Sequence, residues 1–441
     1  MNFEDIETTI SKLGKAKIES PVSHRADGAD SIVFVKDDER ILVDVAIGRV
    51  TDMVSGGRRP ASLELAGPRK QIFFDPSKLK CALVTCGGLC PGLNDILRSI
   101  VLELHYGYGV QNIIGIRHGL QGFIPKYGHE LTELTPETVV NVHEHGGSIL
   151  GSSRGPQDIE TIIDSLERLN VGILFMIGGD GTLRAATAIN SAISRRRLKI
   201  GVIGVPKTID NDIYMISRSF GFDTAVDVAT KAILSAHNEA AGYPNGIGLL
   251  KLMGRHAGFI AATATLAQQD VNFVLIPEVD FDLQGPKGLL KALENRLERR
   301  GHAVIVAAEG AGQKFFTAGE TERDESGNIR LKDIGIYLKQ SIQNYFGNRG
   351  VDVSIKYIDP SYMIRSLPAN ANDRVFCNFL GRNAVHAGMA GKTDLVIGHW
   401  NNHFVNVPLK TVAGKRKRID PKGMLWRSAL EATGQGSLCN P

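Results

Sequence analysis

The sequence has little of what marks several specialised classes of protein. Its 441 residues include 5 cysteines, 2 tryptophans and 6% aromatic residues, and no stretch approaches the roughly 20 uninterrupted apolar residues of a membrane-spanning helix. The 51 Lys and Arg nearly balance the 47 Asp and Glu, which excludes a dedicated nucleic-acid binder. An odd number of cysteines offers no disulfide framework, and the start "MNFEDIE" is acidic where a secretory signal is basic. We therefore expect a cytoplasmic protein without a nucleic-acid or membrane partner.

Two short basic runs interrupt this even charge distribution. They are "RRR" at residues 195–197 and "GKRKR" at residues 414–418. Both could attract phosphates, but runs of this kind usually lie on a solvated face. We interpret both as surface charge.

Apolar runs alternate with glycine-rich turns and amphipathic segments from residue 79 onward. This pattern is typical of parallel sheets with helices on both faces, and we predict an α/β fold of two doubly wound Rossmann-like domains. Strands are predicted at residues 81–86, 112–116, 171–177, 200–205, 247–253, 273–278, 303–309 and 353–358, and helices at 93–104, 182–194, 222–241, 286–299, 333–345 and 373–390.

The domain boundaries follow from the strand count. Residues 1–78 form an N-terminal arm, in which "SIVFVKDDERILVDVAI" alternates like a β-hairpin. We predict a nucleotide-binding domain at 79–211, a substrate-binding domain at 212–390, and a C-terminal extension at 391–441 that crosses back. Ligands are expected at the carboxyl ends of the strands.

Two loops carry candidate phosphate ligands. "CGGLCPGLN" places Gly88 between a strand and a helix, where backbone N–H groups can approach an anion; a plain tight turn is the alternative. "GSSRGPQD" offers Arg154, whose guanidinium could clasp a phosphate or pair with a nearby carboxylate.

The stretch "GGDGT" follows an apolar strand. Gly178 and Gly179 allow close backbone approach, Asp180 can hold a hard cation, and Thr182 is expected to cap the next helix and donate to a phosphate oxygen. A simple strand end with capping residues is the alternative. We favour a nucleotide-phosphate site with Asp180 as the metal ligand.

"PKTIDND" adds two carboxylates two residues apart. On an extended segment Asp210 and Asp212 would face the same side, so that one could accept a proton while the other supports a metal shell. The alternative is a turn with two solvated aspartates.

Further charged residues follow the later strands. "LMGRHAGF" and "AAEGAG" supply Arg255 and Glu309, and "KYIDPSYMIRS" supplies Lys356, Tyr362 and Arg365. They suit an anionic sugar phosphate. His256 is interpreted as a helix-start histidine rather than a base.

Taken together and in this order, these motifs resemble those of the phosphofructokinase family. The similarity extends to "FGFDTAV" and covers residues 67 to 389, and it is strongest to ATP-using members that are close in sequence to pyrophosphate-using ones. The resemblance implies phosphorylation of fructose 6-phosphate at its 1-hydroxyl in glycolysis. It implies Mg²⁺ and ATP as cofactor and co-substrate, and a homotetramer, or a homodimer, with sites that borrow residues across an interface.

The resemblance also implies roles for individual residues. Asp210, Arg255 and Asp212 would be catalytic, with Asp210 as the base, and Asp180 would hold the metal. The donor phosphates would be bound by Gly88, Arg154, Gly155, Gly179, Asp180, Gly181 and Thr182. Fructose 6-phosphate would be bound by Thr208, Ile209, Asp210, Met253, Gly254, Arg255, Glu309, Tyr362, Met363, Ile364 and Arg365, with Lys356 from a neighbouring subunit.

The choice of phosphoryl donor depends on two positions. In pyrophosphate users the family has an acidic residue at the position of Gly181, whereas glycine leaves room for a nucleotide α-phosphate. Lys207 is shared with the pyrophosphate users, but the ATP-using subgroup combines it with glycine. The resemblance therefore implies an ATP-dependent enzyme of a family whose members include allosteric enzymes. Two positions depart from the bacterial ATP users: "NGIGLL" lacks an arginine, so one phosphate contact must come from elsewhere or be absent, and Tyr362 replaces a histidine. The allosteric effector site of those enzymes is therefore not carried over.

Three alternatives remain open. A pyrophosphate-dependent enzyme of the same family differs only in its donor. A NAD or lipid kinase shares "GGDGT" but lacks "PKTIDND" followed by "MGR" and "YMIR". A catalytically silent ligand-binding subunit conflicts with the retention of Asp180, Asp210 and Arg255.

Overall fold

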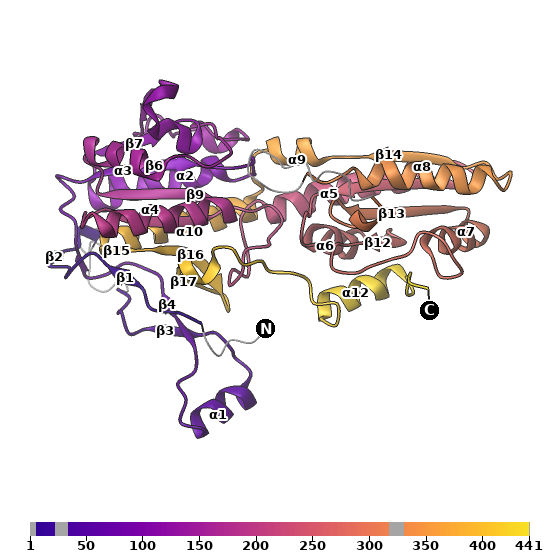
Figure 1. The fold of residues 1–441 in the computed structure, drawn as a ribbon, viewed down its shortest axis with the longest axis horizontal. Coiled ribbons are helices and arrows are strands. Elements are labelled where there is room, and N and C mark those ends of the chain that lie inside the picture. Colours follow the sequence, from indigo (N-terminus) through magenta and orange to yellow (C-terminus); the bar gives the residue numbers. More distant parts are fainter. Residues whose placement is uncertain (1–5, 23–33, 317–329, 441) are drawn as a thin grey trace. The chain divides into compact units, whose positions relative to one another are not determined.

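The structure is a computed structural model that describes residues 6–22, 34–316 and 330–440. The chain divides into two compact units (Figure 1). Unit 1 comprises Met1–Thr208, Ile213–Gly221 and Leu367–Lys415. Unit 2 comprises Ile209–Asp212, Phe222–Ser366 and Arg416–Pro441.

Unit 1 is built on a nine-stranded sheet. The strand order is β3-β4-β17-β16-β10-β9-β6-β7-β8, and the five neighbouring strands from β16 to β7 run parallel. The flanking strands are antiparallel. In sheet order their bounds are Arg40–Leu42, Ser62–Leu65, His403–Pro408, Leu395–Trp400, Gly201–Pro206, Ile173–Gly178, Lys80–Thr85, Asn112–Ile116 and Leu131–Glu133.

Helices cover both faces of this sheet. Ala82, Leu174 and Val202 pack with apolar residues of α3 (Ile159–Arg168) and α4 (Asp180–Arg195). On the other face, α10 (Ala371–Met389) packs on α2 (Leu93–Leu102) and on β10. All six residues of β9 and of β10 are buried, which explains why these strands are nearly continuous apolar runs.

Unit 2 contains a parallel four-stranded sheet in the order β12-β13-β11-β14. One face packs on α7 and α8 through leucine, isoleucine and phenylalanine side chains, and α5 and α6 contact the same strands. The strand bounds are Phe273–Leu275, His302–Ala308, Gly246–Leu252 and Ser354–Ile358; the helices are α5 Phe222–Ala241, α6 Phe259–Gln268, α7 Leu289–Arg300, α8 Ile334–Gly347, α9 Ser361–Ser366 and α12 Met424–Thr433.

The predicted fold class is confirmed, because each predicted strand and helix is present within a few residues. The arm does not contain the predicted hairpin among its described residues. Residues 31–33 lie outside the described residues, and β3 pairs with β4 after the intervening helix α1 (Ile47–Ser55). The arm thereby extends the edge of the nine-stranded sheet. Short elements complete unit 1: β1 Ser11–Lys12, β2 Ile18–Glu19, β5 Gln71–Ile72, β15 Lys392–Thr393 and α11 Leu409–Val412.

The two units differ from the predicted boundaries at the C-terminal side. The sequence pattern predicts residues 367–390 as part of the second domain, but α10 belongs to unit 1 because it packs on α2. Strands β16 and β17 continue the sheet of unit 1. The last segment, from Arg416, belongs to unit 2, where α12 packs on α6. In the described part of the chain, no helix combines the length and apolar character needed to cross a membrane.

Candidate active site

Turns at the carboxyl ends of β6, β9 and β10 bring together the glycine-rich motifs of unit 1, and we call these the glycine turns. The Lys207 ammonium donates to the Gly88 carbonyl oxygen at 2.7 Å, and a Cβ on Gly88 would lie 3.5 Å from an Arg154 guanidinium nitrogen. The Ser152 hydroxyl donates to the Gly87 carbonyl at 2.6 Å. Gly88, Arg154 and Lys207 therefore lie side by side, although they are far apart in the sequence.

Backbone conformation at one position and lack of space at another explain why glycine occupies them. Gly155 has φ +85°, in the left-handed region that other residues rarely adopt. At Gly178, a Cβ would lie 2.1 Å from the Thr182 hydroxyl oxygen, so any side chain there would displace Thr182. Glycine at the first position of "GGDGT" therefore leaves the space that the Thr182 side chain occupies.

The predicted capping role of Thr182 is wrong. Helix α4 begins at Asp180 with Gly179 as its N-cap, and no side chain accepts a hydrogen bond at that cap. Thr182 lies inside the first turn and is buried. The backbone N–H groups at this helix start are thus left to other acceptors, as in many anion sites.

Asp180 lies at the start of α4. Its carboxylate accepts a hydrogen bond from the Gly414 backbone N–H at 2.7 Å and lies 3.5 Å from the Arg184 guanidinium. Next to it, a Cβ on Gly181 would meet no atom within 4 Å. The space beside Gly181 is therefore open, which is the condition that the donor-specificity prediction requires.

In unit 2, charged residues follow the strand ends, and we call these segments the charged turns. The first is Ile209–Asp212, which enters unit 2 directly after Thr208. The predicted extended geometry of this segment is wrong: Asn211 has φ +54°, and residues 209–210 form a turn. Asn tolerates this region better than other residues with a Cβ. The Asp212 side chain is only 10% exposed, so the solvated alternative does not hold either.

The "MGR" turn follows β11 and meets this segment. The Arg255 backbone N–H donates to Asp210 Oδ2 at 3.4 Å. Gly254 has φ +134°, and a Cβ there would lie 2.6 Å from the Ala257 carbonyl oxygen. The Arg365 Nε lies 3.3 Å from the sulfur of buried Met253. Asp210, Met253, Gly254, Arg255 and Arg365 are thus brought together within unit 2.

The electrostatics of the charged turns distinguish two candidate bases. Burial, followed by the negative charges of Asp212 and Glu309, raises the pKa of Asp210 to about 7, while Arg365 acts in the opposite direction. Burial, with the charges of Arg416 and Arg255, lowers the pKa of His256 to about 4. Asp210 therefore has the pKa suited to a general base near neutral pH.

One predicted ligand, Lys356, lies away from this group in the described part of the chain. Lys356 pairs in register with Gly248, about five residues or ~16 Å along the strand direction from Met253. Its ammonium lies 3.8 Å from Glu239. Tyr362 and Met363 are 81% and 66% exposed, whereas Ile364 is buried. Lys356 remains a prediction for a neighbouring subunit.

Sequence reasoning missed the C-terminal basic run. Within unit 1, Gly414 donates to Asp180, and within unit 2 the Arg416 guanidinium lies 3.1 Å from Asp212 Oδ2. The interpretation of residues 414–418 as surface charge holds for Lys415 and Arg418, which are exposed, and is wrong for Arg416, which binds the predicted site carboxylate of Asp212. Its four consecutive basic residues were the available signal for an anionic partner, but they could not specify which carboxylate. The run at 195–197 does lie on the surface, where Arg196 pairs with Glu160, Asp164 and Glu167.

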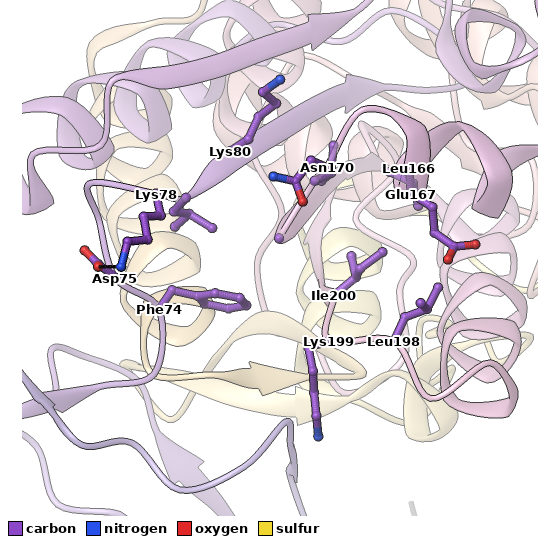
Figure 2. Close-up of a pocket in the computed structure, with 13 residues that line it drawn as sticks. Phe74, Asp75, Lys78, Lys80, Leu166, Glu167, Asn170, Leu198, Lys199 and Ile200 are labelled. Atoms are coloured by element: carbon purple, nitrogen blue, oxygen red, sulfur yellow. Dashed lines mark ion pairs between the residues drawn. The ribbon is translucent and has the colours of Figure 1, made fainter.

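A cavity of about 500 Å³ in unit 1 lies at the opposite end of the sheet (Figure 2). Lys80 begins β6, and Gly172 and Ile200 precede β9 and β10, so the cavity is at the amino ends of the strands. Ligands of doubly wound sheets bind at the carboxyl ends. The size of this cavity therefore does not make it the candidate active site.

Comparison with known proteins gives a consistent result. The Phosphofructokinase family model matches residues 80–388. The chain is 47% identical to the ATP-dependent 6-phosphofructokinase of Borreliella burgdorferi, covering 98% of this chain and 97% of that protein. It is 44% identical to the ATP-dependent 6-phosphofructokinase of Amycolatopsis methanolica, covering 99% and 96%.

Solved structures show the same fold at lower identity. A pyrophosphate-dependent phosphofructokinase from Marinobacter aquaeolei has a TM-score of 0.66 and 22% identity, covering 82% of this chain and 93% of that chain. Phosphofructokinase from Pichia pastoris has a TM-score of 0.62 and 21% identity, covering 77% and 36%. With a family model over most of its length and relatives above 40% identity along nearly all of it, this chain belongs to the phosphofructokinase family.

Proposed function

We propose that the chain is an ATP-dependent 6-phosphofructokinase, which transfers the γ-phosphoryl group of ATP to the 1-hydroxyl of fructose 6-phosphate. The observation that carries this proposal is the position of Asp210, a carboxylate of raised pKa beside Arg255, Arg365 and Glu309. The names of the relatives in Borreliella and Amycolatopsis support ATP as the donor. The open space beside Gly181 supports it independently.

The glycine turns are proposed to bind the donor. Backbone N–H groups at the start of α4, with Gly88, Gly155, Gly179 and Thr182, would face phosphate oxygens. Arg154 and Lys207 would supply positive charge, and the Lys207 contact with Gly88 fixes its distance from that turn. The α-phosphate of a nucleotide would use the space beside Gly181.

Asp180 fits the residue type and setting of a magnesium ligand. Among the described residues, no group of three or more His, Cys, Asp or Glu side chains could hold a metal by itself. Mg²⁺ is commonly held by one or two carboxylates together with substrate phosphates, and Asp180 at the start of α4 suits that arrangement. Bound there, Mg²⁺ would neutralise charge on the donor phosphates. Asp212 is proposed to support this charge distribution from its own turn.

The charged turns are proposed to bind and activate the sugar phosphate. Asp210 would accept the proton of the 1-hydroxyl while Arg255 balances charge on the migrating phosphoryl group. Arg365, Glu309 and the backbone of Thr208, Ile209, Met253 and Gly254 would orient fructose 6-phosphate, with Tyr362, Met363 and Ile364 from α9. Lys356 would act on a neighbouring subunit of a homotetramer or homodimer.

The cysteines support a proposal for the compartment. None of the five cysteines, all of which lie among the described residues, is in a disulfide bond, and four are buried. We place the enzyme in the reducing cytoplasm.

Purified protein tests the proposed reaction. We expect a coupled assay with fructose 6-phosphate, Mg²⁺ and ATP to give turnover, and pyrophosphate to give at least about tenfold less kcat/KM at equal donor concentration. Equal or better use of pyrophosphate would replace the donor assignment. Absence of turnover with either donor would refute the enzyme itself.

A further inference from the structure

The turn Ile209–Asp212 of unit 2 has no regular secondary structure to hold it. It contains a residue in the left-handed region, Asn211, and its two carboxylates are the ones assigned above to proton acceptance and charge support. A catalytic carboxylate must be held within fractions of an ångström of its productive position. The contacts that fix this turn therefore bear directly on turnover.

Residues near the C-terminus of the chain supply such contacts. The Arg416 guanidinium lies 3.1 Å from Asp212 Oδ2, and the Lys417 backbone N–H donates to the Asp212 carbonyl oxygen at 2.8 Å. The same residue is thus held through its side chain and its backbone. Such a two-point contact fixes the direction of the Asp212 side chain as well as its position.

The segment that makes these contacts is itself anchored in unit 2. The Ile419 backbone N–H donates to the Glu278 carboxylate at 2.8 Å, and the Lys417 ammonium lies 5.0 Å from the centre of the Phe259 ring. Glu278 also accepts from the Gly258 backbone N–H, just before α6. We call residues 416–419 the C-terminal strap.

The strap therefore joins two charged turns. One end holds Asp212, and the other end binds Glu278, which in turn binds Gly258, three residues after Arg255. Arg255 in turn donates its backbone N–H to Asp210. This closed set of contacts links residues that lie more than 150 positions apart in the sequence.

We propose that Arg416 is a positioning residue for the phosphoryl transfer: it holds Asp212, and through it the Asp210 turn, in the geometry that the reaction needs. This inference rests on the proposed roles of Asp210 and Asp212. A guanidinium suits this task because its planar donors make directional, charge-assisted hydrogen bonds with a carboxylate. Lysine offers the charge without the planar geometry.

The test is the steady-state kinetics of the Arg416→Gln enzyme. We expect kcat to fall about tenfold to a hundredfold, the scale on which small misplacements act, with KM for fructose 6-phosphate within about threefold of wild type. Arg416→Lys is expected to recover part of kcat. Arg416 is 29% exposed, so free guanidinium can reach the site in Arg416→Ala and is expected to restore turnover.

Arg418→Gln is the matched control, because Arg418 is an exposed arginine of the same strap with no assigned contact to Asp212. We expect it to keep near-normal kcat. Equal losses in the two Arg→Gln variants would overturn the proposal, since a general loss of positive charge would then explain them. Normal kcat in Arg416→Gln would overturn it as well.

Two further measurements separate a wrong role for Arg416 from misfolding of the variant and from a wrong assignment of the base. The thermal unfolding midpoint shows whether Arg416→Gln folds. If it does not, the changes in kcat and in KM of Arg416→Lys decide whether Arg416 is a positioning residue. Unchanged kcat in Arg416→Lys, together with no guanidinium rescue of Arg416→Ala, refutes that role. If Asp210→Ser retains turnover, the proposed base is wrong. If Asp210→Ser is inactive and Arg416→Gln is normal, only the role of Arg416 is refuted.

Discussion

The glycine turns of unit 1 and the charged turns of unit 2 both follow the carboxyl ends of parallel strands, but they differ in what holds them. In unit 1, the backbone and the absence of side chains set the geometry, as Gly178 and Gly155 show. In unit 2, burial and neighbouring charges set the protonation state, because burial, followed by the charges of Asp212 and Glu309, raises the pKa of Asp210. A change of charge is therefore expected to alter the fold of the first arrangement little, and to alter the protonation state of the second.

The largest effect is expected at the charged turns, with Asp210→Ser. Without an acceptor for the hydroxyl proton, kcat should fall at least about a hundredfold, the usual scale for a general base. Folding should change little because the site is at a turn. Coupled kinetics and the thermal midpoint measure both.

Asp227→Ser is the matched control for this variant. Asp227 is an aspartate of α5 whose side chain pairs with Lys231 and is 47% exposed. Turnover close to wild type is expected there. Near-normal turnover in Asp210→Ser would remove Asp210 from its role.

A smaller effect is expected at the glycine turns, with Gly181→Asp. The helix start accepts an acidic side chain in open space, so stability should be kept. Repulsion of a nucleotide phosphate by about 1–2 kcal/mol should lower kcat/KM for ATP roughly fivefold to thirtyfold, with KM for fructose 6-phosphate little changed.

Gly181→Ala separates bulk from charge in the same position. Because a methyl group meets no atom within 4 Å, it should lower kcat/KM for ATP less than the aspartate does. ATP kinetics that are unaltered in Gly181→Asp would contradict the steric and electrostatic argument for donor choice.

The smallest effect is a shift in pH dependence. Since the pKa of Asp210 is raised to about 7, the base is protonated below that pH, and kcat/KM should fall as the pH drops through it. Asp212→Asn removes one of the charges that raise this pKa, so the acidic limb should move to lower pH. A profile from about pH 5.5 to 9 for wild type, Asp212→Asn and the control Asp227→Asn measures it. An acidic limb that stays in place would show that Asp212 does not set the charge state of Asp210.

The strands and their glycine-rich ends were predictable because each depends on residues close in sequence. "VGILFMIGGDGT" specifies a buried strand, a tight turn and a helix start without reference to the rest of the chain. The strand pairing of the arm was not predictable, because β3 could pair with any nearby edge strand. In the structure it pairs with β4, which follows helix α1 in the chain. The same holds for α10, whose membership of unit 1 follows from its packing on α2.

The sequence by itself determined the family, the parallel sheets and the chemical groups of the site, since these follow from local patterns of apolar, glycine and acidic residues. Tertiary structure alone decided the shape of the Ile209–Asp212 turn and the partner of Arg416. A basic residue in a charged run could pair with many different carboxylates at similar energy, and the sequence does not show which one it contacts. Only the folded backbone brings Arg416 to Asp212. Because the Asp212 carboxylate is largely buried, its contact with Arg416 is stronger than the same contact in water.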